Sequence, residues 1–417
     1  MKKRYYQQLL RTLNESSTGR ILVITGARQT GKTTLVKTCF PDYEYISLDD
    51  PVTRVAYASL TASQWHDLYA QAILDEVQKL PSLVDSVKAV YDHWGEPRYV
   101  LLGSSQLLLL NKVKESLAGR CHIIELYPLT LPEILTDDDD SGEALAASCL
   151  QTTLSNGELP PLLPSFTLDA NYSKKVGALE HVIRYGSYPI MTDPALSDRQ
   201  RMDWLRNYTR TYLERDVRDM AMMRDLEPYI KLQQMTALQT ACVLNVSEWA
   251  KRLGMATKTV SRYLEYLRLS FQVMILPSWT RNESKRLTKA PKIHYMDTGV
   301  LRTIARRSGT LTGWEFESLV ITEIAKQIWQ LPIHAELYHL RTHDGREVDL
   351  LAETEEGFYA FEIKQTEHAT PTDARHLVGL EDILDKPLIH AFVVSLDTKT
   401  HQFTDKITAI HAAYLLT

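Results

Sequence analysis

Residues 20–34 read RILVITGARQTGKTT, in which an apolar stretch leads into Gly26, four further residues, and then Gly31, Lys32 and Thr33. This is the G-x-x-x-x-G-K-[ST] pattern of the P-loop, whose backbone N–H groups hold nucleotide phosphates. The apolar residues predict the buried parallel strand that such a loop follows. The helix that starts after the loop directs its positive end at the phosphates. The stretch therefore predicts an α/β fold with a nucleotide site.

Each position of the loop has a physical reason. Gly26 and Gly31 allow the backbone to turn and to approach phosphate without a Cβ in the way. Lys32 is expected to reach the β- and γ-phosphates of ATP, and the Thr33 hydroxyl to bind Mg²⁺. The expected nucleotide-binding residues are Gly26, Ala27, Arg28, Gln29, Thr30, Gly31, Lys32, Thr33 and Thr34.

The bulk composition is that of an ordinary globular protein. The chain has 417 residues, of which 44% are hydrophobic and 24% charged, and two or three domains are expected. A net charge of −5 excludes a globally basic nucleic-acid binder. The four cysteines form no CxxC pair, and neither a signal peptide nor a membrane span is recognisable, so we expect a cytoplasmic protein with reduced thiols. The cysteines are Cys39, Cys121, Cys149 and Cys242.

Two further strands are expected to end near the phosphates. Residues 71–75 read QAILD and are followed by Glu76, so Asp75 is expected to hold Mg²⁺ and Glu76 to polarise the attacking water. The alternative is a solvent-facing pair of acids. Residues 99–103 (YVLLG) end at Ser104, which can hydrogen-bond the γ-phosphate or simply cap the next helix. This alternation predicts a doubly wound parallel sheet with the ligand at the carboxyl ends of its strands.

Arg120 closes the segment SLAGR (116–120). It can act as an arginine finger on the γ-phosphate of a neighbouring subunit, or be an ordinary surface arginine. Further on, residues 136–175 contain four consecutive aspartates, Asn-Gly and Pro-Pro. These features predict a solvated insertion or linker rather than a metal site.

A helix–turn–helix is predicted around Gly254. Ser247 caps a first helix, and apolar residues recur at helical spacing into a second helix over 257–269. The second helix can enter a major groove, and the basic stretch 281–292 can follow phosphates as a wing. The alternative is that this region mediates domain packing. The DNA-binding candidates are Lys258, Arg262, Arg281, Lys285, Arg286 and Lys289, and the basic stretch also includes Lys292.

Residues 347–365 (EVDLLAETEEGFYAFEIKQ) predict a β-hairpin in which position i pairs with position 711 − i. Only this register gives one wholly apolar face. It places Asp349 opposite Glu362, with Lys364 two residues along. Facing carboxylates destabilise the fold unless a cation neutralises them. Either a divalent metal or Lys364 on a solvated face can do so.

The chain resembles AAA-type ATPases of a prokaryotic family whose C-terminal domain of unknown function has a nuclease-like fold. The resemblance rests on the P-loop, ILDEVQ, LLGSS, SLAGR, YPLTLPE (127–133), RYGSYP (184–189), YLERDV (212–217) and the DTG of 297–299. It favours Arg120 as a finger and implies self-association. The D…E-x-K pattern likewise resembles PD-(D/E)xK nucleases, also called restriction-endonuclease-like folds. That resemblance implies Mg²⁺ binding by Asp349, Glu362 and Glu317, with Lys364 positioning water.

These observations predict a P-loop ATPase core (1–135), a linker (136–175), a helical connector (176–245), a winged helix–turn–helix (246–292) and a nuclease-like α/β domain (293–417). The leading hypothesis is an ATP- and Mg²⁺-dependent ATPase that couples its nucleotide state to DNA, with branched or junction DNA suggested by analogy alone. One alternative is an ATP-operated switch that acts on protein partners and carries a silent nuclease-like domain. Another is an ATP-gated, metal-dependent DNase.

Overall fold

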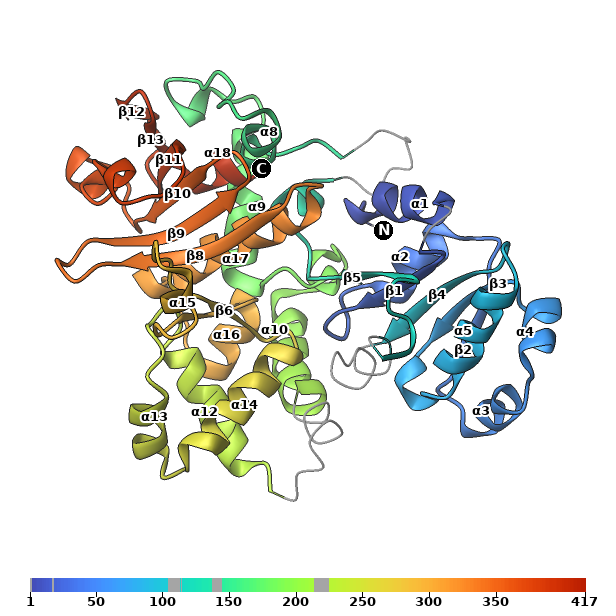
Figure 1. The fold of residues 1–417 in the computed structure, drawn as a ribbon. Helices are drawn as coiled ribbons and strands as arrows, with labels where there is room; N and C mark the ends of the chain where they lie inside the picture. The colour runs from blue at the N-terminus through green and yellow to red at the C-terminus, as the bar shows by residue number, and fades with distance from the viewer. Residues whose placement is uncertain (1, 17–18, 104–112, 114, 137–144, 214–224) are drawn as a thin grey trace.

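The computed structural model describes residues 2–16, 19–103, 113, 115–136, 145–213 and 225–417. Three bodies are visible in Figure 1: the N-terminal sheet in blue, a helical region in green and yellow, and the C-terminal sheet in orange and red. Among the described helices, none is long and apolar enough to cross a lipid bilayer.

The N-terminal body is an α/β domain built on a parallel sheet. In the described residues its five strands lie in the order β2-β3-β4-β1-β5, and every neighbouring pair is parallel. All five residues of β1, which lies between β4 and β5, are buried, as the ILVIT pattern predicts. Its elements are α1 (Tyr6–Glu15), β1 (Ile21–Thr25), α2 (Lys32–Cys39), β2 (Glu44–Ser47), α3 (Pro51–Ala58), α4 (Ala62–Leu68), β3 (Gln71–Asp75), η1 (Val77–Lys79), α5 (Leu83–His93), β4 (Arg98–Gly103), β5 (Cys121–Glu125) and α7 (Leu131–Leu135).

The helical region contains a pair of helices joined by a tight turn, followed by a two-stranded antiparallel sheet of β6 and β7. Gly254 ends the first of these helices with a φ of 66°, a left-handed conformation in which glycine is favoured. The described elements are α9 (Tyr172–Tyr185), η3 (Pro189–Thr192), α10 (Asp198–Asn207), the π-helix η4 (Tyr208–Leu213), α12 (Glu227–Leu238), α13 (Val246–Leu253), α14 (Thr257–Leu269), β6 (Val273–Leu276), α15 (Glu283–Arg286), β7 (Lys292–Tyr295) and α16 (Thr298–Ala305). Helix α16 packs against α9, α10 and α12, so it lies with this region.

The C-terminal body is a mixed sheet whose six described strands follow the order β12-β13-β11-β10-β9-β8. Strands β9 and β10 pair antiparallel, with Phe358 opposite Glu353 and Phe361 opposite Leu350. In both pairs the two residue numbers sum to 711, as the predicted pairing of position i with 711 − i requires, so the predicted register is confirmed. The elements are α17 (Gly313–Gln330), β8 (Ala335–Arg341), β9 (Glu347–Thr354), β10 (Phe358–Ile363), η5 (Pro371–Ala374), η6 (Leu380–Asp382), β11 (Leu388–Ser395), β12 (His401–Thr404), β13 (Ile407–His411) and α18 (Ala412–Leu416).

The segment 136–175 differs from the solvated linker that its sequence predicts. Residues 137–144, which hold the four aspartates, lie outside the described residues. From Ser148 onward the chain packs on the C-terminal body: the segment contains α8 (Cys149–Asn156) and η2 (Phe166–Leu168), and Leu150 and Phe166 are fully buried. The acidic and proline-rich composition concealed a few apolar residues, and these are sufficient to anchor the segment.

Candidate nucleotide site and the C-terminal carboxylate cluster

The loop between β1 and α2 has the backbone conformation that its glycines permit. Gly26 has a φ of 153°, and a Cβ at this position would lie 2.2 Å from the carbonyl oxygen of Leu126. Gly31 has a φ of 88° and directly precedes α2. Both positions therefore require glycine, because other residues would clash or be strained there. The loop leaves β1 at the carboxyl end of the parallel sheet.

The side chains of the loop contact its own backbone and the carboxyl end of β3. The Lys32 ammonium donates to the carbonyl oxygens of Gly26 and Ala27, at 2.9 and 2.8 Å. The Thr33 hydroxyl donates to a carboxylate oxygen of Asp75 at 2.8 Å, and the Tyr45 hydroxyl donates to the same oxygen at 2.8 Å. Burial and the Asp75 carboxylate both raise the pKa of Tyr45, so its hydroxyl keeps its proton. A hydroxyl and a carboxylate within 2.8 Å are hard oxygen ligands that fit Mg²⁺.

Glu76 follows Asp75 in a left-handed backbone conformation, with a φ of 59°. This value is uncommon for a residue other than glycine and turns the side chain away from the line of the strand. The Glu76 N–H donates to Asp75 at 2.9 Å, and its carboxylate accepts from Gln78. Asp75 thus ends β3 and Glu76 follows it, at the same sheet edge as the P-loop, as their sequence positions predict.

The two remaining candidates of this domain have different outcomes. Ser104 lies outside the described residues, although its strand β4 ends at Gly103, which pairs with Thr25 just before the P-loop. Arg120 directly precedes β5, and Cys121 pairs with Ile21 at the amino end of β1. Arg120 therefore lies at the opposite sheet edge from the P-loop of its own chain, and its expected role on the γ-phosphate of a neighbouring subunit stays a prediction. It pairs with Asp92 through bonds of 2.7 and 3.2 Å, which lower the pKa of Asp92.

Several residues that the sequence analysis did not select also surround the P-loop. Arg4, which is 5% exposed, donates to the carbonyl oxygens of Thr30 and Tyr127 and pairs with Glu133. The Tyr208 hydroxyl of η4 lies 3.1 Å from the carbonyl oxygen of Arg28. These contacts join α1, the P-loop and the helical region. No short sequence motif predicts these contacts, although the motif RYGSYP ends at Pro189, which borders the same loop.

A cavity of about 250 Å³ opens beside the loop. One wall is formed by Thr30, Gly31 and Thr34, and the facing wall comes from the N-terminal segment and the 189–194 turn. Its other lining residues are Lys2, Arg4, Leu129, Pro189, Ile190, Thr192, Asp193 and Pro194. The cavity therefore borders the first turn of α2, where a nucleotide held by the loop would extend.

The motifs RYGSYP and DTG meet in one buried junction. Asp297 accepts from the Ser187 N–H at 2.7 Å and caps α16 through the Val300 N–H at 2.9 Å. Glycine is needed on both sides, because a Cβ at Gly186 would lie 2.2 Å from the Asp297 carboxylate, and one at Gly299 would lie 2.3 Å from the Tyr185 carbonyl oxygen. Burial raises the pKa of Asp297, and these N–H donors oppose that rise. The junction fixes α16 onto the 185–189 turn.

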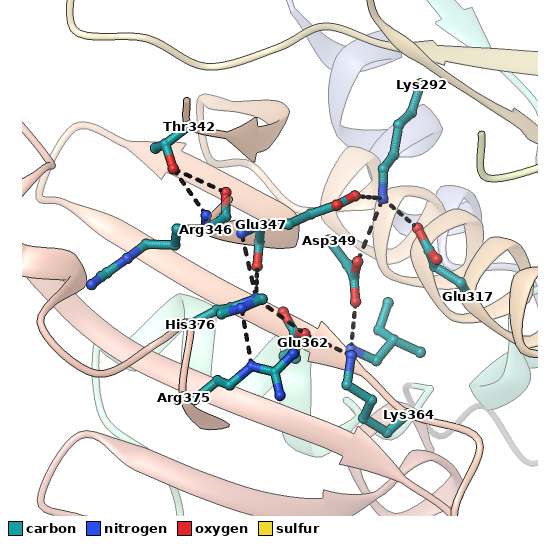
Figure 2. A network of polar contacts seen from close by, with 11 residues as sticks. Lys292, Glu317, Thr342, Arg346, Glu347, Asp349, Glu362, Lys364, Arg375 and His376 are labelled. Atoms are coloured by element: carbon teal, nitrogen blue, oxygen red, sulfur yellow. Dashed lines mark hydrogen bonds and ion pairs between the residues drawn. The ribbon is translucent and has the colours of Figure 1, made fainter. Parts of the chain in front are cut away.

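The C-terminal carboxylates gather around a lysine from the helical region, as Figure 2 shows. The Lys292 ammonium, on β7, lies 2.9 Å from Glu317, 2.9 Å from Glu347 and 3.5 Å from Asp349. Its side chain is only 4% exposed. Lys292 was expected at the end of a basic wing, and instead its ammonium lies among these carboxylates. We refer to Lys292, Glu317, Glu347, Asp349, Glu362 and Lys364 as the carboxylate cluster.

Burial sets the charge state of the cluster. Desolvation and the nearby Asp349 raise the pKa of Glu317 to about 8 and that of Glu362 to about 8. Burial alone would lower the pKa of Lys292, but the surrounding carboxylates raise it well above its usual value. The raised pKa values favour the protonated forms of Glu317 and Glu362, and the ammonium groups of Lys292 and Lys364 offset negative charge in the cluster without any added ion.

The carboxylates of the cluster are already engaged by donors of the protein itself. Asp349 accepts from the Ile363 N–H at 2.9 Å, and Glu362 accepts from Lys364 at 2.6 Å. In the part of the chain that the structure describes, no three histidine, cysteine, aspartate or glutamate side chains are grouped so as to hold a metal. The expected Mg²⁺ ligands Glu317, Asp349 and Glu362 lie in one cluster, but the Lys292 ammonium lies between Glu317 and Asp349. As arranged, the cluster does not fit a metal.

The DNA-binding candidates divide into two groups. Lys258 and Arg262 are exposed on α14, the second helix of the pair. The wing candidates instead face the C-terminal body. Arg286 pairs with Glu353 at 3.0 Å, and Arg281 donates to the Leu384 carbonyl oxygen at 2.9 Å. These bonds support the packing alternative for the wing.

Lys289 also contacts the C-terminal body, as Arg281 and Arg286 do: its ammonium donates to the Arg341 carbonyl oxygen at 3.3 Å. Lys285 is exposed. The intervening Leu287 is 90% exposed. Of the four wing candidates, Lys285 is the one whose ammonium has no hydrogen-bond or ion-pair partner among the residues that the structure describes.

Comparison with known proteins divides the chain into three matched parts. Residues 18–135 match the family described as an AAA domain. Residues 177–311 match a domain of unknown function (DUF8612), and residues 312–415 match another (DUF4143).

Two relatives match nearly the whole of this chain, the uncharacterized proteins Mb2031c of Mycobacterium bovis and Rv2008c of Mycobacterium tuberculosis. Each is 27% identical over 409 residues, covering 95% of this chain and 81% of the relative. Among solved structures, the Walker-type ATPase PABY2304 of Pyrococcus abyssi is 14% identical with a TM-score of 0.42, covering 72% of this chain and 94% of that one. The AAA match, the parallel sheet and the loop geometry together identify residues 18–135 as a P-loop ATPase domain, which supports ATP binding and hydrolysis.

Proposed function

We propose that this protein is a Mg²⁺-dependent ATPase whose nucleotide state controls DNA binding through the helical region, and that its nuclease-like C-terminal domain does not cleave. The observation that carries the ATPase part is the convergence of Lys32, Thr33, Asp75 and Glu76 at one sheet edge. ATP is proposed to lie with its phosphates on the loop and its base and ribose in the 250 Å³ cavity beside Thr34.

The roles of the residues follow from their positions. The Lys32 ammonium donates to two backbone carbonyl oxygens and is proposed to exchange them for phosphate oxygens when ATP binds. Thr33 and Asp75 are proposed to hold Mg²⁺, which when bound neutralises charge on the phosphates. Glu76 lies beside this pair, where it can orient and deprotonate a water molecule. Asp75 accepts three hydrogen bonds that keep it in place for this task.

The contacts around the P-loop provide a route from nucleotide to the rest of the chain. Tyr208 touches the Arg28 carbonyl oxygen, and Pro189 borders the cavity next to Gly31. The Ser187–Asp297 junction then links this turn to α16. A change in loop conformation on binding or hydrolysis is proposed to move η4 and α16, and with them the helix pair.

DNA contact is proposed for the exposed face of α14 through Lys258 and Arg262. A pair of helices with a glycine turn and a following two-stranded sheet supports a winged helix–turn–helix, and a basic second helix suits a major groove. The wing contributes mainly to domain packing. Lys292 in the carboxylate cluster favours the silent form of the nuclease-like domain over the DNase alternative.

The deciding experiment measures ATP turnover and nucleotide binding in three proteins. The unmodified chain should hydrolyse ATP with Mg²⁺, Lys32→Ala should lose binding, and Glu76→Gln should bind ATP while turning it over about 100-fold more slowly. Normal turnover by Glu76→Gln would refute its role in activating water.

The DNA part has its own test. Duplex and branched DNA should bind the unmodified chain with an affinity that falls as salt is raised, and Lys258→Ala with Arg262→Ala should weaken it. Lys251→Ala, on the preceding helix, is the matched control. Supercoiled DNA should stay uncut with Mg²⁺ or Mn²⁺. Binding unaffected by the double substitution would refute the α14 face as the contact, and a lack of DNA binding would favour the alternative of protein partners.

A further inference from the structure

A second polar cavity, far along the chain from the P-loop motif, is lined by arginines. Its volume is about 640 Å³. Three parts of the helical region line it: the end of α10 with η4, helix α12, and the end of α16. None of the described residues that line it is acidic. Its five arginines are Arg206, Arg210, Arg302, Arg306 and Arg307, and we call it the arginine cavity.

Arg302 is the most buried of the five, with 9% of its surface exposed. One end of its guanidinium donates to the Gly309 carbonyl oxygen at 2.5 Å. The other nitrogen, Nη1, is buried and has no hydrogen-bond partner within the described residues. A buried guanidinium N–H without an acceptor destabilises a fold, so the native state is expected to supply an acceptor here.

The charges of the cavity are only partly balanced. Arg206 pairs with Asp203 at 3.0 Å, and Arg307 pairs with Glu315 at 3.4 Å. Arg210 and Arg306 have no acidic partner among the residues that the structure describes. Among the described residues, five guanidinium groups less two carboxylates leave three positive charges in this concave site.

The helix dipole explains only part of this arrangement. Cations are favoured at a helix C-terminus, which suits the arginines at the end of α16. Arg306, however, ends α16 with a φ of 54°, where glycine is the usual residue. The two arginines of α10 and η4 belong to other elements and converge on the same space. A dipole at one helix end does not require this convergence.

We propose that the arginine cavity binds a small anion bearing several phosphate groups, at a site separate from the P-loop. Guanidinium groups bind phosphate oxygens in a paired geometry, and three or more around one cavity match a diphosphate or triphosphate. A volume of about 640 Å³ is within the usual range for a small-molecule site. The polar residues Gln234 and Ser308 offer further hydrogen bonds to a nucleoside or sugar part.

The position of the cavity gives such a ligand access to the ATPase domain. Arg210 is on the short π-helix η4, and two residues earlier Tyr208 reaches the P-loop carbonyl of Arg28. Arg302 is on α16, whose first turn is capped by Asp297 at the junction with the 185–189 turn. An anion held between Arg210 and Arg302 would thus bridge the two elements that contact the nucleotide site.

Calorimetry with inorganic tripolyphosphate on the full-length chain tests the proposal. The P-loop also binds this probe, so Lys32→Ala serves as the background. This background should bind one tripolyphosphate, with an affinity that falls as salt is raised. Adding Arg210→Gln and Arg306→Gln, both exposed in the fold, should weaken binding at least about tenfold. Arg252→Gln, an exposed arginine paired with Glu248 on α13, is the matched control and should change nothing.

The outcomes separate cleanly. No binding by the Lys32→Ala protein, or binding that the double substitution leaves intact, overturns the proposal. Equal melting temperatures of the unliganded proteins show that the substitutions preserve the fold. A short single-stranded oligonucleotide is the second probe. If the oligonucleotide binds the Lys32→Ala protein and the Arg210→Gln and Arg306→Gln substitutions weaken that binding, while tripolyphosphate does not bind, the site belongs to nucleic acid and the small-anion proposal is wrong. If the Lys32→Ala protein loses ATP turnover but still binds tripolyphosphate, the failure of this site and the failure of the proposed ATPase function can be distinguished.

Discussion

The P-loop site and the carboxylate cluster both contain lysine and acidic side chains, but they differ in what surrounds the key aspartate. At the P-loop, Asp75 accepts from two hydroxyl groups and one N–H, and all its partners are neutral. In the cluster, Asp349 lies 3.5 Å from the ammonium of Lys292, which also contacts Glu317 and Glu347. The first arrangement leaves a negative charge that a divalent ion can bind. In the second, the protein provides its own cation.

This difference shows that a carboxylate motif does not define a metal site until its neighbours are known. Hydroxyl groups orient a carboxylate without neutralising it, whereas a buried lysine removes the reason for an ion to bind. The lysine comes from β7, more than fifty residues before Asp349. A motif that spans only the hairpin cannot contain this information. Four substitutions test the comparison, in order of decreasing expected effect.

The largest effect is expected for Asp75→Asn. Loss of the carboxylate weakens Mg²⁺ binding, so ATP turnover at saturating nucleotide should fall on the order of 100-fold. Asp349→Asn is the matched control at the other site and should leave ATP turnover unchanged. Steady-state ATPase assays over a range of Mg²⁺ concentrations measure both. A similar loss in the two variants would show that the sites are not independent.

Lys292→Ala should destabilise the fold by about 3 kcal/mol, because it leaves buried carboxylates without their cation. Mn²⁺ should restore part of this stability in the variant and have no such effect on the unmodified chain. Thermal unfolding without nucleotide, with and without Mn²⁺, measures this. Lys285→Ala, an exposed lysine of the same basic stretch, is the control. Equal stabilisation of the unmodified chain by Mn²⁺, abolished by Asp349→Asn, would show that the cluster binds metal after all.

The pH dependence of stability should also reveal the cluster. The pKa of Glu317 is raised from 4.5 to about 8 in the folded chain. The folded state then holds a proton that the unfolded state releases, so this contribution is complete below about pH 4.5 and is lost as pH rises through about 8. Glu317→Gln should reduce the decline in unfolding free energy across this window by about 2 kcal/mol. Glu347→Gln should not, because its pKa is lowered. Denaturant titrations at several pH values measure the difference.

The smallest effect is expected for Arg120→Ala. Its bonds to Asp92 are exposed and lie at the sheet edge opposite the P-loop. ATP turnover at low protein concentration should therefore match that of the unmodified chain. If Arg120 serves a neighbouring subunit, turnover of the unmodified chain should instead rise with protein concentration, and this rise should vanish in the variant.

Much of the nucleotide site followed from the sequence because its residues act within short segments. A strand, a glycine loop and a helix start place Lys32 and Thr33 locally, and a second strand places Asp75 and Glu76. The hairpin register was equally accessible, because alternation of Val348, Leu350, Phe361 and Ile363 permits one buried face. The packing of residues 148–175 was missed, since a few apolar side chains outweigh a polar composition.

The sequence by itself determined the parallel sheet with its P-loop and the pairing of β9 with β10, because backbone geometry and local periodicity control both. Only the tertiary structure decided which cation faces Asp349, which edge of the sheet carries Arg120, and which arginines share a cavity. Those outcomes depend on contacts between segments far apart in the chain. The energy of a buried charge is set by its neighbours in space, whatever their distance in sequence.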